Sequence, residues 1–91
     1  MYLEIVSPEA TLFSGEVESV TVPGVDGEFQ MLNNHAPIVS VLSKGEVKIS
    51  GNVTLDEDVQ ESFSTKEGKT VLSINSGTLE MKDNRVIILA D

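Results

Sequence analysis

The sequence has no cysteine and no tryptophan, and its only aromatic residues are three Phe and one Tyr. Without cysteine, disulfides and thiolate metal sites are excluded. Aliphatic side chains must therefore fill most of the core. The longest uninterrupted apolar run, Val86–Ala90, is far shorter than the roughly 20 residues that span a bilayer. The N-terminus lacks the basic and apolar stretches of a signal peptide, so we expect membrane contact only through a partner.

Basic side chains are also scarce: 6 Lys and Arg stand against 15 Asp and Glu, a net charge of −9. This balance argues against nucleic acid, whose phosphates need a basic stripe, and against direct adhesion to an anionic bilayer. Residues 1–43 contain no Lys or Arg. If their acidic side chains share a face, that face suits a basic or polar partner, whereas the simpler interpretation is a solvated surface that maintains solubility. These acids are Glu4, Glu9, Glu16, Glu18, Asp26 and Glu28.

With 91 residues the chain is expected to form one domain, residues 1–91. A chain of this size buries only about 60–65% of the surface that its unfolded form exposes, so a large internal cavity would be costly. Turn-forming pairs recur at short intervals between segments rich in Val, Ile, Thr and Leu, and no window shows a helical period. This pattern predicts an all-β fold, a two-sheet β-sandwich or barrel of short strands.

Three stretches show strands most clearly. Residues 45–50 and 78–82 alternate apolar and polar side chains, which indicates one buried and one wet face. The Asp83-Asn84 pair predicts a hairpin between 78–82 and 85–91. A second hairpin is expected between 63–65 and 70–74, across a turn that contains glycine.

Other stretches are less regular. Residues 86–89 do not alternate, so we expect both faces of that strand to be covered. Residues 16–22 alternate imperfectly, which suggests a bulge. Residues 55–61 form either an acidic loop or a single helical turn, because Thr54 and Glu57 have the spacing of a capping box.

The sequence contains no complete copy of the phosphate-binding, calcium-binding or His-pair metal motifs. Gly68-Lys69-Thr70 resembles the end of a phosphate-binding loop, but Phe63 stands where the loop needs its first glycine. The acidic run 56–58 lacks the turn glycine of a calcium loop. The single histidine, His35, excludes a His-pair metal site.

His35 leaves two kinds of role open. A serine triad, or a general acid–base pair with Glu28, is formally possible, although no nucleophile-elbow sequence supports the triad. The structural interpretation is that residues 33–37 form a tight loop. Asparagine tolerates a positive φ, and Pro37 fixes its own φ and biases Ala36 toward extended geometry. His35 would then stabilise the loop through backbone hydrogen bonds.

Several motifs in order along most of the chain resemble one family, the N-terminal domain of the epsilon subunit of bacterial F-type ATP synthases, the counterpart of mitochondrial delta. The resemblance is carried by Ser7 through Phe13 to Gly15, Gly27-Glu28, His35-Ala36-Pro37, Ser76–Met81 and Val86–Asp91. It implies a β-sandwich of about ten short strands. Typical members continue into a C-terminal helical hairpin, which is not expected here because the sequence ends at Asp91.

The resemblance also implies a function. The chain would be a non-catalytic rotor subunit that needs no cofactor or metal, links the gamma subunit to the c-ring and couples proton flow to ATP synthesis. It would lie peripherally at the cytoplasmic face of the bacterial inner membrane. The residues expected on the c-ring side are Glu28, Asn33, Asn34 and His35, in one neighbourhood. Loops of the c-ring commonly present basic and polar side chains, which would suit the acidic first half.

The chain departs from the family pattern at several positions. Gln30 stands where the family usually has glycine, and Asn33-Asn34 stand where it has Pro-Gly. The segment 50–74 is longer than in typical members. Two alternatives to a rotor subunit remain: a free-standing β-sandwich that binds a basic peptide or a saccharide, and a small hydrolase that uses Glu28 and His35.

Overall fold

The computed structural model describes all residues from 1 to 91. It contains ten strands and one short 3-10 helix, which confirms the predicted all-β class. The first five strands are β1 Tyr2–Val6, β2 Thr11–Glu16, β3 Ser19–Gly24, β4 Gly27–Leu32 and β5 Ile38–Leu42. The others are β6 Gly45–Ser50, β7 Phe63–Lys66, β8 Lys69–Ile74, β9 Gly77–Lys82 and β10 Arg85–Ala90, with the 3-10 helix η1 at Gln60–Ser62.

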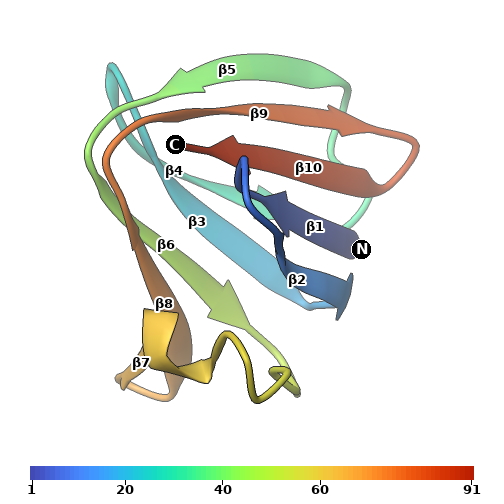
Figure 1. The fold of residues 1–91 in the computed structure, drawn as a ribbon. Coiled ribbons are helices and arrows are strands. Elements are labelled where there is room, and N and C mark those ends of the chain that lie inside the picture. The colour runs from blue at the N-terminus through green and yellow to red at the C-terminus, as the bar shows by residue number, and fades with distance from the viewer.

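The strands form one strongly curled sheet that folds into two layers (Figure 1). Strands β2, β1, β10, β9 and β5 make the first layer, and β4, β3, β6, β8 and β7 make the second. The layers join where β5 meets β3 at the Leu42–Gly24 pair. All neighbouring strands are antiparallel except β1 and β10. The result is the expected sandwich, continuous along one side.

Apolar side chains at alternate positions of the strands form the core between the layers. In β6, Val47 and Ile49 are buried while Glu46 and Lys48 lie outside, as their spacing predicts. In β9, Leu79 and Met81 repeat the pattern, and β1, β3 and β10 contribute further aliphatic side chains. Because the core cluster contains only one aromatic side chain, Phe13, interlocking Val, Ile, Leu and Met fill nearly all of it.

Both predicted hairpins are present. Asp83 and Asn84 have φ values of 52° and 59°, the two positive values that a tight type I′ turn between β9 and β10 requires. The β7–β8 hairpin turns at Glu67 and Gly68, with φ values of 52° and 78°. These turns set the register that keeps the apolar side chains of each strand on the core side.

Three expectations need correction. Residues 16–22 do not form one bulged strand, since β2 ends at Glu16 and β3 begins at Ser19; the irregularity falls instead between Ile5 and Val6, where β1 pairs with β2. Of the two alternatives for residues 55–61, the acidic loop is present up to a turn at 57–59. Thr54 caps no helix, and the 3-10 helix that follows has no side-chain cap. Strand β10 is not covered on both faces, since Leu89 is 53% exposed.

The two ends of the sandwich carry different groups of turns (Figure 1). The β3–β4, β5–β6 and β8–β9 turns gather at one end beside Asp91, whose N–H donates to the Ser76 carbonyl. Met1, the β4–β5 loop and the β9–β10 turn gather at the other end, where the Tyr2 N–H donates to the Asn84 carbonyl. The structure contains no helix with the length and apolar character needed to cross a bilayer.

Candidate partner-binding surfaces

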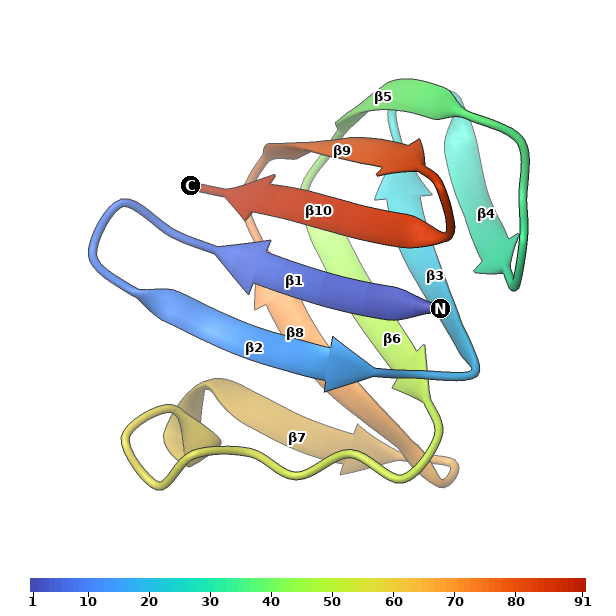
Figure 2. The same ribbon diagram turned by 90° about the vertical axis from the view of Figure 1, so that its right-hand side faces the viewer.

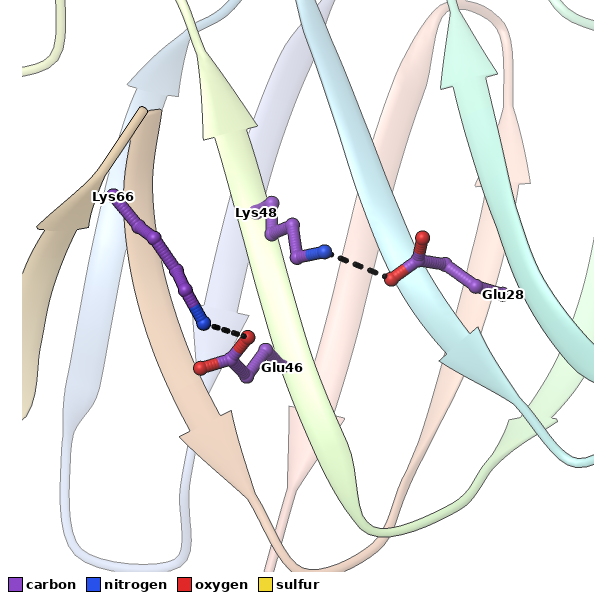
Figure 3. Close-up of polar contacts among 4 residues, drawn as sticks. All are labelled: Glu28, Glu46, Lys48 and Lys66. Carbon is purple, nitrogen blue, oxygen red and sulfur yellow. Dashed lines mark hydrogen bonds and ion pairs between the residues drawn. The ribbon is translucent and has the colours of Figure 1, made fainter. Parts of the chain in front are cut away.

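Glu28 lies at the start of β4, beside the β3–β4 turn. Its carboxylate accepts a hydrogen bond from the Lys48 ammonium on β6 at 3.1 Å, and its side chain is 53% exposed (Figure 3). A second pair on the same outer face joins Lys66 on β7 to Glu46 on β6 at 3.5 Å. Exposed pairs of this kind contribute only about 0.2–1 kcal/mol, so Glu28 remains available to a partner's charge.

Asn33, Asn34 and His35 lie together in the loop between β4 and β5. Asn34 has a φ of 60°, the left-handed conformation expected for an asparagine in this loop. Its N–H donates to the Asn84 side-chain carbonyl at 2.7 Å, which ties the loop to the β9–β10 turn. The Asn33 side-chain oxygen accepts a hydrogen bond from the Met1 ammonium at 2.8 Å. The loop is therefore fixed by contacts to two other parts of the chain.

His35 is exposed, and its hydrogen bonds stay near its own loop. Its backbone N–H donates to the Leu32 carbonyl at 3.2 Å, which closes the turn. The ring nitrogen Nδ1 lies 2.7 Å from the Ala36 carbonyl oxygen. Because a carbonyl can only accept, Nδ1 carries the proton in this contact. These bonds match the structural interpretation of His35.

Glu28 and the Asn33–His35 loop do not share a neighbourhood, contrary to the expectation from the sequence. Glu28 pairs with Pro23 near one end of β4, whereas Leu32 pairs with Ser19 at the other end. The four steps between Glu28 and Leu32 extend about 13 Å at the usual rise of a strand. A direct acid–base pair between Glu28 and His35 is therefore ruled out in this fold, and with it the hydrolase hypothesis that used the pair.

Three of the five large apolar side chains that are exposed lie on the outside of the first layer; the other two are Val25 in the β3–β4 turn and Leu32 at the end of β4. Two cross-strand rows over β5, β9, β10 and β1 form this surface, which we call the apolar face: Val41–Thr78–Leu89–Val6 and Val39–Glu80–Ile87–Glu4. Val39 is 76% exposed, Val41 58% and Leu89 53%. Grouped exposure of this kind, rather than single scattered side chains, is typical of a surface that binds another protein.

The apolar face is hollowed and reaches the end of the sandwich that holds Glu28. A hollow of about 240 Å³ and another of about 440 Å³ share Thr78 and Leu89 in their linings. At the edge of the second hollow, the Val41 carbonyl accepts a hydrogen bond from the N–H of Val25, a residue of the β3–β4 turn that is 59% exposed. Apolar surface therefore continues from the first layer onto the turn that precedes Glu28.

The sequence contained a sign of the apolar face. The unbroken run at 86–89 indicated that both sides of that strand contact apolar surroundings, and the structure supplies such surroundings on the core side only. Val39 and Val41, two residues apart in one strand, share a side that an isolated domain would expose. These patterns indicate apolar cover on the outer side of the strands, which the structure of this chain does not supply.

Two comparisons with known proteins, a family model and curated relatives, agree on one family. The family model for "ATP synthase, Delta/Epsilon chain, beta-sandwich domain" matches residues 1–91. The ATP synthase epsilon chain of Chlorobium limicola is 37% identical over 89 residues, covering 98% of this chain and 86% of that protein. The epsilon chain of Leptospira interrogans is 38% identical over 89 residues, but this chain spans only 59% of its length.

Two solved structures share the fold. A chain in the central stalk and c-ring structure of the Tetrahymena thermophila mitochondrial ATP synthase aligns with a TM-score of 0.75 at 15% identity, covering 99% of this chain and 62% of that one. A chain in the Euglena gracilis mitochondrial ATP synthase structure aligns with a TM-score of 0.72 at 20% identity, covering 97% of this chain and 48% of that one.

Proposed function

The chain belongs to the ATP synthase delta/epsilon family, and from this premise we propose that it is a non-catalytic rotor subunit that links gamma to the c-ring. In this role residues 1–91 act as a single domain. The subunit transmits rotation driven by proton flow and so couples that flow to ATP synthesis. It lies peripherally at the cytoplasmic face of the bacterial inner membrane and reaches the membrane only through the complex.

The main support for this proposal is the exposed apolar face of the first layer. A subunit that rotates with its neighbours needs a permanent interface, and permanent interfaces are more apolar than transient ones. We assign gamma to this face. The carboxylates of Glu4 and Glu80 lie in the same row as Val39 and Ile87, so the gamma surface that fits here is apolar with basic side chains set within it.

The c-ring contact is proposed for the other layer, at Glu28, Asn33, Asn34 and His35. Because these residues lie at opposite ends of β4, one ring surface contacts all four only when β4 runs along it. Strand β4 pairs with β3 alone, so one of its edges faces away from the sheet. This orientation leaves the apolar face of the first layer free for gamma.

Copurification tests the proposal. An affinity-tagged chain, expressed in cells that contain the ATP synthase and extracted from their membranes with mild detergent, should retain gamma and the c-ring in constant ratio. Recovery of the tagged chain without gamma, in a soluble fraction that also holds a basic peptide or a saccharide, would instead indicate the free-standing binding module.

A further inference from the structure

The sheet has a seam between its two terminal strands. Strands β2 and β7 stand at the ends of the strand order, and each pairs with one neighbour only. Residues 51–62, which contain no strand, pass below β2 and in front of β7 in Figure 2, and they line hollows shared with each of these strands. An unpaired strand edge is a template on which another chain can add a strand, so an open seam would offer two such templates.

Two apolar side chains hold this segment in the seam. Val53 and Leu55 pack against the core, while Thr54 between them is exposed. Leu55 lines a hollow of about 210 Å³ with Leu12 and its neighbours on β2. On its other side Leu55 lines a hollow of about 360 Å³ with Phe63 and its neighbours on β7 and β8. One leucine therefore lies between both terminal strands.

A single hydrogen bond joins the segment to a strand beside it: the Phe63 N–H at the start of β7 donates to the Gln60 carbonyl. Its other bonds run from the Val59 N–H to the Asp56 carbonyl, from the Ser62 N–H to the Val59 carbonyl and from the Gln60 side chain to the Leu55 carbonyl. Apart from the Phe63 bond, where the segment enters β7, these bonds stay within the segment. The acidic side chains of residues 56–61 form no ion pair. Apolar packing through Val53 and Leu55 is thus the principal attachment of the segment.

We propose that residues 51–62 form a strap that guards β2 and β7 against strand pairing with a second copy of this chain. The strap fills the seam with the chain's own apolar side chains. It also carries Asp56, Glu57 and Asp58 on the outside, where they repel a second copy whose net charge is −9. Natural sheets use charged side chains and covering loops for the same purpose. This inference does not depend on the identity of the partner at the apolar face.

A paired set of variants tests the strap. Val53→Ser with Leu55→Ser removes the apolar attachment, whereas Asn52→Ser with Thr54→Ser changes two exposed neighbours by the same kind of substitution. Hydrogen exchange and sedimentation are measured at high salt, where a Debye length of about 3 Å removes most charge repulsion. In the first variant, amide exchange in 51–62 and along β2 should accelerate about ten- to hundredfold, the factor expected from losing much of the burial of two apolar side chains. A concentration-dependent dimer should also appear.

The wild type and the Asn52→Ser/Thr54→Ser variant should remain monomeric. Unchanged exchange in Val53→Ser/Leu55→Ser would overturn the attachment through these side chains. Faster exchange without a dimer would overturn the guarding role. If β8 amides lose protection, the variant has unfolded globally, and the milder Leu55→Ala variant then decides the same two questions.

Discussion

The Glu28 carboxylate on β4 lies 3.1 Å from the Lys48 ammonium on β6, with β3 between the two strands (Figure 3). The pair lies on the polar outer face of the second layer, opposite the apolar face of the first. The two outer faces of the sandwich thus differ in chemistry. The proposed function uses both, with gamma on the apolar side and the c-ring along β4.

Glu28→Lys should weaken the coupling of ATP hydrolysis to proton pumping several-fold when mutant complexes are reassembled with membranes at low salt. In the proposed orientation the substitution sets a positive charge against basic c-ring loops, and it also repels Lys48. Glu28→Gln should have only a small effect, because an exposed ion pair contributes about 0.2–1 kcal/mol. The Glu28→Lys defect should shrink as salt is added, since screening weakens the repulsion.

Glu46→Lys is the matched control for Glu28→Lys. It breaks the other ion pair on the same outer face, in which the Glu46 carboxylate lies 3.5 Å from the Lys66 ammonium. It changes the net charge by the same amount as Glu28→Lys. Its coupling should stay close to wild type. If Glu28→Lys and Glu46→Lys couple equally well at low salt, Glu28 does not face the c-ring.

Asn34→Ala should lower the free energy of unfolding by about 1 kcal/mol, because alanine is strained at a φ of 60°. Asn34→Gly should stay within about 0.5 kcal/mol of wild type, since glycine accepts this conformation and keeps the backbone N–H that binds Asn84. Urea denaturation measures both. Equal losses in the two variants would mean that the asparagine side chain, and not the backbone conformation, stabilises the loop.

His35→Ala should lower the free energy of unfolding by only about 0.5–1 kcal/mol, because the exposed ring makes a single contact, with the Ala36 carbonyl. ATP turnover per assembled complex should not change. A large loss of turnover, in a variant that folds and assembles normally, would contradict the structural role assigned to His35.

Gly77→Ala should destabilise the fold by about 1–3 kcal/mol, because a methyl group there would collide with the Leu89 carbonyl oxygen on the paired strand. Gly15→Ala is the control, since its methyl group would meet only the Phe13 ring at 3.4 Å, an ordinary contact. That variant should be unchanged or up to about 1 kcal/mol more stable. Thermal or urea unfolding of the two variants gives the comparison.

Much of the fold could be predicted from local pattern. The alternation around Val47 and Ile49 follows from a half-buried strand, and Asp83-Asn84 forms the turn that its residue types favour. The left-handed Asn34 was predictable for the same reason. These features depend on neighbours in sequence, so the sequence alone was enough to find them.

The rest depends on contacts between distant residues. Glu28 and His35 were expected together, but the length of β4 separates them, and strand length is set by pairing with β3. The exposure of Leu89 was not predictable from the sequence. The apolar pattern of the strand is the same whether its outer side is covered by this chain or by another protein. The strap at 51–62 has no periodic pattern, and its place follows from where β2 and β7 end.

The central claim, that the apolar face binds gamma, is tested most directly by titrating purified gamma into three forms of the chain. These are the wild type, Val41→Asp with Leu89→Asp, and the control Ser73→Asp, which adds charge to an exposed position on β8 in the other layer. The account predicts that the double variant binds gamma about thirtyfold or more weakly, as expected for the centre of an interface, while Ser73→Asp binds like wild type. Equal affinity of the double variant and the wild type, with both folded, would contradict it.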